Sequence, residues 1–178
     1  MDLFWYFLIY SFLGFLLEVA FARAIHSPKR DRKCFLLLPL CPVYGLGALG
    51  ILAAGEALVR WPLLLALVGG GAATAAEYLM GLFYQKALGV EFWNYTGLPL
   101  NVGGRICLPF SVAWGVLSLG LVYLIHPLAS VLVDHIPGWL TPAAAILLLT
   151  DGAVTTYLLK TTGTTDSLKW YEALRPAG

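Results

Sequence analysis

Long apolar runs are the feature of this sequence that most restricts its fold. Several stretches contain about 20 residues with few charges, the length at which a helix crosses the hydrocarbon core of a bilayer. The mean hydropathy of +0.80 agrees with this pattern. So do the 12% of charged residues, since soluble domains contain about 25%. The sequence therefore predicts an all-α, polytopic integral membrane protein.

The apolar runs predict a single transmembrane domain over residues 1–160, followed by a cytoplasmic tail over residues 161–178. We expect five membrane helices, at about residues 3–22, 42–59, 62–84, 109–125 and 139–160. The first run is too long for a signal peptide and follows no Lys or Arg, so we interpret it as a helix. Residues 128–138 are expected to form an external loop after His126 and Pro127.

The positions of the basic side chains predict the orientation of the helices. Lys and Arg cluster at Arg23 and within residues 29–33, whereas residues 128–138 contain neither. Loops rich in Lys and Arg usually stay in the cytoplasm. We therefore expect a multi-pass protein of the inner (plasma) membrane, with its N-terminus outside and its C-terminus in the cytoplasm.

The stretch from Glu91 to Trp114 is too polar, and too rich in Gly and Pro, to be one of the long apolar runs, and its polar part precedes the apolar segment that starts at Pro109. Lipid cannot satisfy the hydrogen bonds of an irregular backbone, so such a segment must be buried in protein or face a wet cavity. We expect it on the cytoplasmic side, before the fourth helix. Trp93, Asn94 and Asn101 in this segment are candidate walls of a binding pocket, together with Tyr44.

Three acidic residues lie inside the predicted helices, and one arginine lies in the polar segment. Helix rise, counted from the outer ends, puts Glu18 and Glu77 roughly 22 Å deep and Asp151 roughly 18 Å deep. Ionisable side chains at such depth are costly and often functional. Arg105 approaches the same layer from the cytoplasm, and we expect it to pair with Glu18 or Glu77. The excess of acids predicts a bound proton or cationic group.

A structural interpretation of the same residues remains open. In this interpretation, the ion pair expected for Arg105 has a structural role alone and attaches the polar segment to the helices. Asp151, close in sequence to Thr150 and Thr155, can be a hydrogen-bond partner in helix packing. Trp61, Trp114 and Trp139 are expected as anchors at the membrane interface.

Other site types find little support in the sequence. There is no Walker A loop, no G-x-S-x-G and no H-E-x-x-H motif. Cys34, Cys41 and Cys107 lack C-x-x-C spacing, so we expect reduced thiols, with no zinc site and no other metal or cofactor. The net charge of +1 gives no reason to expect nucleic acid as a partner.

Several motifs, taken in order, resemble a family of small bacterial membrane proteins. They are Tyr10-Ser-Phe-Leu-Gly-Phe-Leu-Leu-Glu18, Cys41-Pro-Val-Tyr-Gly45, Glu77-Tyr78, Phe92-Trp-Asn-Tyr95 and Asn101-Val-Gly-Gly-Arg-Ile-Cys-Leu108. Over residues 10–115 the chain is similar to the family called putative ABC-transporter type IV, or CmpB-like permeases. The resemblance implies transport and points to the same candidate site residues.

We therefore expect a permease-like component of membrane transport, with a cytoplasm-facing polar pocket for a small ligand or cation. Five helices are few for a complete pathway, so a homo-oligomer or a partner subunit is expected, surrounded by membrane lipid. One alternative is an intramembrane enzyme acting on a lipid or isoprenoid head group, with Glu18 or Glu77 as general acid or base and Arg105 holding a phosphate. Another is a structural or sensor subunit.

Overall fold

The computed structural model describes residues 2–26 and 34–169 of the chain. About 75% of the chain is helical. The described residues contain no β-strand, and a single antiparallel bridge joins Val102 to Ile106. The predicted all-α class is confirmed.

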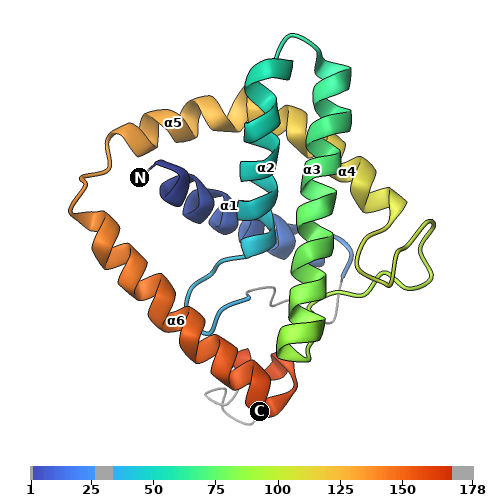
Figure 1. Cartoon of the computed structure of the whole chain (residues 1–178), viewed down its shortest axis with the longest axis vertical. Coiled ribbons are helices and arrows are strands. Elements are labelled where there is room, and N and C mark those ends of the chain that lie inside the picture. Colours follow the sequence, from blue (N-terminus) through green and yellow to red (C-terminus); the bar gives the residue numbers. More distant parts are fainter. Residues whose placement is uncertain (1, 27–33, 170–178) are drawn as a thin grey trace.

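The helices follow one another along the chain, and the longest connections precede α2 and α4 (Figure 1). The α-helices are α1 (Asp2–Ala24), α2 (Pro42–Leu58), α3 (Pro62–Phe83), α4 (Leu108–Gly120), α5 (His126–Asp134) and α6 (Leu140–Thr162). Two π-helical turns, η1 (Tyr84–Leu88) and η2 (Leu121–Ile125), extend α3 and join α4 to α5. A 3-10 turn, η3 (Thr165–Leu168), follows α6.

Four helical stretches are long and apolar enough to cross a membrane. They are Asp2–Ala24, Pro62–Leu88, Leu108–Asp134 and Leu140–Thr162. The helix α2 is apolar but shorter; its 17 residues span roughly 25 Å at the usual rise of an α-helix. Length and composition thus support a multi-pass membrane protein.

The helix that begins at Leu108 continues beyond its predicted end. The sequence predicts an end near residue 125 and a loop from residue 128, but α5 extends the helix to Asp134. Pro127 lacks an amide hydrogen and normally breaks a helix. Here the preceding turn is a π-turn, in which the His126 amide donates to the Leu121 carbonyl. Such a bulge lets the helix continue past the proline. The predicted loop is therefore wrong for residues 128–134.

A hairpin of α2 and α3 forms the centre, with α1 packed against α2 and α4 against α3. Small residues allow these helices to approach closely. A Cβ atom added at Gly70 would lie 2.9 Å from the backbone of Gly115. On the other side of the hairpin, Gly14 lies directly against the Tyr44 side chain.

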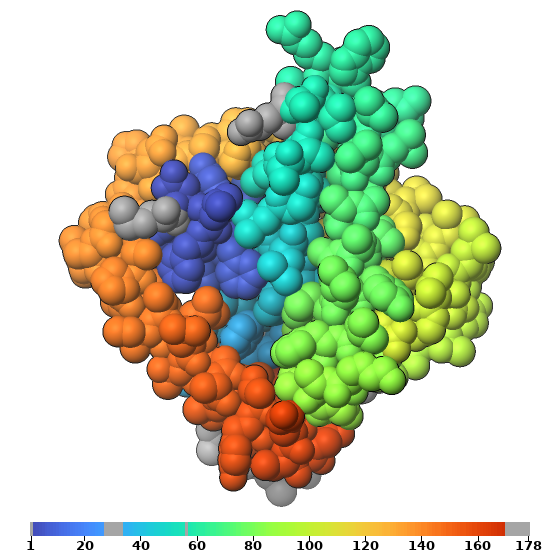
Figure 2. All heavy atoms as spheres, in the orientation of Figure 1, coloured from blue at the N-terminus to red at the C-terminus, as the bar shows by residue number. Residues whose placement is uncertain are grey.

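Hydrogen bonds between side chains attach α1 to the C-terminal half of the chain. The Tyr10 hydroxyl lies 2.8 Å from Nδ1 of His126. The Trp5 indole donates to the Thr141 hydroxyl at 3.1 Å. These bonds matter because α6 stands apart from α2 and α3. A groove separates them, visible below the centre of the space-filling view (Figure 2) and lined by residues such as Phe35, Met80 and Leu148.

The close contact between α3 and α4 can be tested with two neighbouring glycines. Gly70→Ala should destabilise the protein in detergent by about 1–3 kcal/mol, because the new methyl group would overpack the contact with α4. Gly71→Ala is the matched control, since nothing lies within 4 Å of a Cβ atom built there. Thermal unfolding followed by size-exclusion chromatography measures both variants. Equal melting temperatures would show that the helices do not pack in this way.

Candidate ligand-binding site

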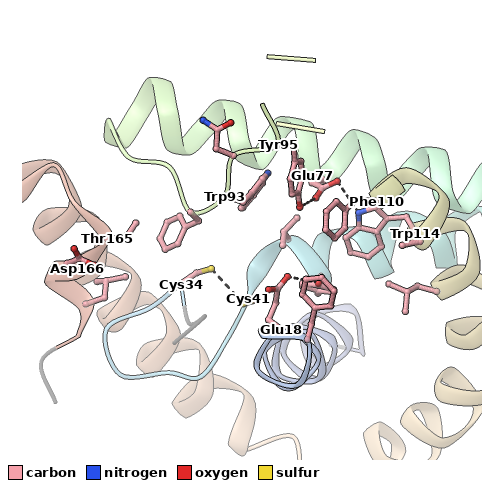
Figure 3. Close-up of a pocket in the computed structure, with 18 of the residues that line it drawn as sticks. Glu18, Cys34, Cys41, Glu77, Trp93, Tyr95, Phe110, Trp114, Thr165 and Asp166 are labelled. Atoms are coloured by element: carbon pink, nitrogen blue, oxygen red, sulfur yellow. Dashed lines mark hydrogen bonds between the residues drawn. The ribbon is translucent and has the colours of Figure 1, made fainter. Parts of the chain in front are cut away.

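A cavity of about 280 Å³ lies where α1, α2, α3 and α4 approach the irregular segment that follows η1. Residues 92–95 of that segment form one wall, and Cys34, Cys41 and η3 form another (Figure 3). The polar segment between α3 and α4 therefore faces a cavity, which is one of the two environments expected for irregular backbone in a membrane protein.

Glu77 of α3 is the most buried acid on this wall, with 5% of its surface exposed. The Tyr95 hydroxyl donates to its Oε1 at 2.9 Å, and the Trp114 indole donates to its Oε2 at 3.1 Å. An indole N–H can only donate. One carboxylate thus connects α3 to α4 and to the polar segment (Figure 3).

Glu18 of α1 is the second carboxylate on the cavity wall and is partly buried. Its Oε1 accepts a hydrogen bond of 2.7 Å from the Tyr44 hydroxyl. The Tyr44 ring packs against Trp114, with ring centroids 5.0 Å apart. A continuous chain of contacts therefore links the two acids through Tyr44 and Trp114.

Besides its hydrogen bond to Glu77, two further contacts hold Tyr95 in place. Its ring stacks on Phe110 with centroids 4.6 Å apart, and its amide donates to the Gly104 carbonyl at 2.8 Å. Burial, together with the negative charge of Glu77, raises the pKa of the Tyr95 hydroxyl. The hydroxyl therefore keeps its proton at neutral pH and remains a donor to the carboxylate.

Trp93 and Asn94, both predicted as pocket walls, line the cavity. The Trp93 indole donates to the Arg105 carbonyl at 2.8 Å. The Asn94 amide donates to Glu91 at 2.9 Å, and its oxygen accepts from the amide and hydroxyl of Thr96. These hydrogen bonds stay within the polar segment and fix its shape.

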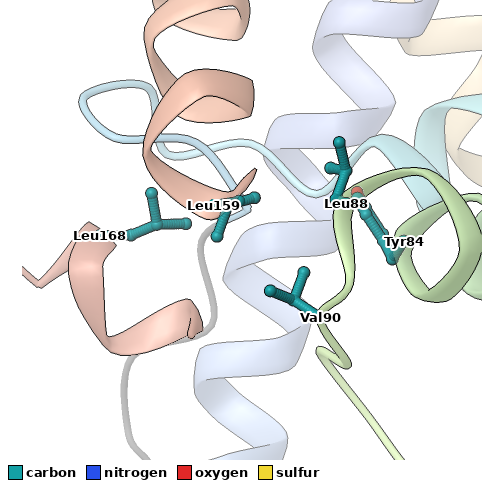
Figure 4. Packing of buried hydrophobic residues seen from close by; sticks show 5 residues of the cluster. All are labelled: Tyr84, Leu88, Val90, Leu159 and Leu168. Carbon is teal, nitrogen blue, oxygen red and sulfur yellow. The ribbon is translucent and has the colours of Figure 1, made fainter. Parts of the chain in front are cut away.

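A small apolar cluster, shown in Figure 4, holds η3 where it contributes to the cavity wall. Its buried members are Tyr84, Leu88, Val90, Leu159 and Leu168. They bring the end of α6 and the turn η3 against η1 and the start of the polar segment. This packing explains how η3, more than 70 positions after η1 begins, reaches the cavity wall.

Asn101 and Arg105 lie outside the cavity lining. Asn101 is exposed and donates to the Leu98 carbonyl at 3.0 Å, as a turn residue does. Within the part of the chain that the structure describes, Arg105 forms no ion pair with either acid of the cavity. Its guanidinium lies 5.5 Å from the centroid of the Tyr78 ring, and its stem packs on Gly81.

The expected pairing of Arg105 with Glu18 or Glu77 is therefore wrong in this structure. Gly103 and Gly104 both have positive φ values, 58° and 70°, and reverse the chain immediately before Arg105. L side chains rarely adopt this backbone region, which suits glycine. The reversal directs the Arg105 side chain to Tyr78, on a neighbouring face of α3 from Glu77.

Asp151 is buried on α6 and does not line the cavity. Its Oδ2 accepts from the amides of Leu37 and Leu38 at 3.1 and 2.7 Å. The Thr155 hydroxyl accepts from the amide of Leu36 at 2.9 Å. The chain is not helical there, and lipid could not satisfy these amides. This geometry favours the structural interpretation, in which Asp151 accepts hydrogen bonds that hold the segment before α2 against α6.

The three cysteines are buried and are not joined in disulfides. The sulfur atoms of Cys34 and Cys41 lie 3.8 Å apart on the cavity wall. Among the described residues, no group of three His, Cys, Asp or Glu side chains could hold a metal ion.

A comparison with protein families covers most of the chain. The model of the family described as Putative ABC-transporter type IV matches residues 5–158. The chain belongs to this family. The match extends past the motifs at residues 10–115 and includes α5 and most of α6. No curated protein and no solved structure matches the chain.

In this member of the family, two residues that matter for the cavity were not among the candidates from sequence. Tyr95 has a sequence signal, because it lies two positions after Trp93 in the same motif. Trp114 was expected at the membrane interface but is 6% exposed and bonded to Glu77. Its partner is 37 positions away, and no local spacing reveals such a contact.

Proposed function

We propose that this family member is a permease-like component of membrane transport that binds a small solute in the cavity beside Glu77. The observation that carries the proposal is a buried carboxylate in a cavity lined by apolar helices, of which α1, α3 and the helix that begins with α4 are long enough to cross a membrane. Intramembrane ionisable groups commonly mark substrate and ion pathways. The family description supports the same function. Because the helices are few for a complete pathway, the component works with a second copy or a partner subunit.

The helix ends at the cavity support a topology of five spans, with α2 as the short one. The C-terminal parts of α1 and α3 and the N-terminal parts of α2 and α4 line the cavity, as does η3 after α6. Successive spans that cross in opposite directions would place these ends on one side of the membrane. The basic residues near the end of α1 support a cytoplasmic location for this side.

This orientation predicts that the connection between α5 and α6 faces the outside. Gly138 is exposed and has open space around it, and the native thiols are buried. A cysteine introduced by Gly138→Cys should therefore react with a membrane-impermeant maleimide in intact cells. Labelling that needs permeabilised cells would place this connection in the cytoplasm instead.

The enzyme alternative lacks the support it requires. It assigns Arg105 to a phosphate group, but Arg105 lies against Tyr78 and outside the cavity lining. The basic residue described on the wall is Lys169, which pairs with Asp166 at 2.8 Å.

Uptake in cells tests the transport proposal. Radiolabelled inorganic cations, amines, amino acids and phosphate would be supplied to cells that overproduce the wild type, Glu77→Gln or Asp134→Asn. We expect Glu77→Gln to reduce the uptake of at least one solute about tenfold, the effect of losing about 1.4 kcal/mol of binding. Asp134→Asn is the control, because Asp134 is exposed and outside the cavity lining. Equal uptake by all three cell lines would contradict the proposal.

A further inference from the structure

The side chains of the cavity wall restrict the chemical class of the solute. This inference rests on the proposed function, in which a solute binds beside Glu77. Aromatic rings form much of the wall: Tyr44 from α2, Trp93 and Tyr95 from the polar segment, and Phe110 and Trp114 from α4. They are fixed by ring contacts and by hydrogen bonds to Glu18, Glu77 and the backbone. Faces of such rings attract cations that lie within about 6 Å of the centroid.

The charge of the wall favours the same class. Both oxygens of Glu77 accept hydrogen bonds, but the donors, Tyr95 and Trp114, are neutral. Neutral donors form hydrogen bonds with the carboxylate but carry no positive charge to offset its own. No described basic side chain lies within ion-pair distance of Glu77, and the second carboxylate, Glu18, lines the same cavity. A carboxylate buried in this way calls for a positive partner or a proton, and the aromatic wall favours the positive partner.

The same wall disfavours other charged ligands. An inorganic cation such as Ca²⁺ needs about 6–8 oxygen ligands at once, and the faces of the aromatic rings that form much of this wall supply none. A phosphate or a carboxylate would lie beside two carboxylates, which would repel it. An organic cation differs from both, because it presents its charge through a surface of C–H groups that packs on rings.

We infer that the solute is a small organic cation, a primary amine or quaternary ammonium compound, bound with its charge beside Glu77 and among the rings of Tyr44, Tyr95 and Trp114. The cavity volume of about 280 Å³ suits a molecule of a few heavy atoms beyond the cationic group. Aromatic walls combined with a carboxylate favour the cation over a neutral molecule of equal shape.

Binding to the purified full-length protein in detergent tests this inference. The probes are choline, tetramethylammonium and ethanolamine. The neutral control is 3,3-dimethylbutan-1-ol, in which a carbon atom replaces the charged nitrogen of choline. Because Trp93 and Trp114 line the cavity, tryptophan fluorescence reports occupancy, and thermal unfolding provides a second readout. We expect at least one cation to bind the wild type about tenfold more tightly than the neutral alcohol, as cation–π and charge contacts require.

Two variants test whether the cation binds beside Glu77. Glu77→Gln should weaken the binding of the cation about tenfold and leave that of the alcohol unchanged, whereas Asp134→Asn should bind both as the wild type does. The comparison of the cations with the alcohol uses only wild-type protein, so it stands even if Glu77→Gln unfolds. Equal binding of the cations and the alcohol, or no binding of any cation, would overturn the inference.

Failure of this inference can be told apart from failure of the proposed function. If no organic cation binds but another solute is taken up only when Glu77 is intact, the inference is wrong and the transport proposal stands. If the effect of Glu77 is reproduced by pH alone, the partner of the carboxylate is a proton, and the inference is also wrong. If no solute depends on Glu77 in either assay, both proposals fail.

Discussion

The hydrogen bonds that Glu77 accepts from Tyr95 and Trp114 are the interaction on which the cavity depends. A carboxylate placed within a membrane helix is costly unless polar groups surround it. The two donors reduce this cost, and in doing so they hold the polar segment and α4 against α3. Because both donors are neutral, neither of them offsets the charge of the carboxylate at the cavity wall. The constraint that stabilises the fold therefore also creates the proposed binding site.

The backbone N–H and C=O groups of two non-helical segments also need hydrogen-bond partners, because lipid cannot supply them. In residues 34–41, before α2, the amides of Leu36, Leu37 and Leu38 are accepted by Thr155 and Asp151 of α6. The segment before α4 is satisfied largely from within, by bonds such as that from the Tyr95 amide to the Gly104 carbonyl. Both segments contribute to the cavity wall, and both are held by polar contacts in addition to apolar packing.

Much of the fold can be predicted from the sequence, because helix length and apolar composition act locally. The same is true of part of the site. Counting helix rise put Glu18 and Glu77 at one depth, and the structure brings both to one cavity with Tyr44, Trp93 and Asn94.

The rest depends on contacts between distant residues. The direction of Arg105 follows from the backbone of Gly103 and Gly104. The role of Asp151 depends on amides more than 110 positions away. The passage of the helix through Pro127 requires a π-turn that no local propensity indicates.

The coupling between Glu77 and Tyr95 tests the central claim most directly. A double-mutant cycle with Glu77→Gln and Tyr95→Phe removes the carboxylate charge and the hydroxyl, separately and together, while both side chains keep their shapes. Thermal or chemical unfolding in detergent would give the free energies of unfolding. If the carboxylate holds the polar segment, the two changes should be non-additive by about 0.5–3 kcal/mol, as expected for residues in one hydrogen-bond network. Strictly additive effects would show that Glu77 and Tyr95 do not interact, and that the polar segment is held in some other way.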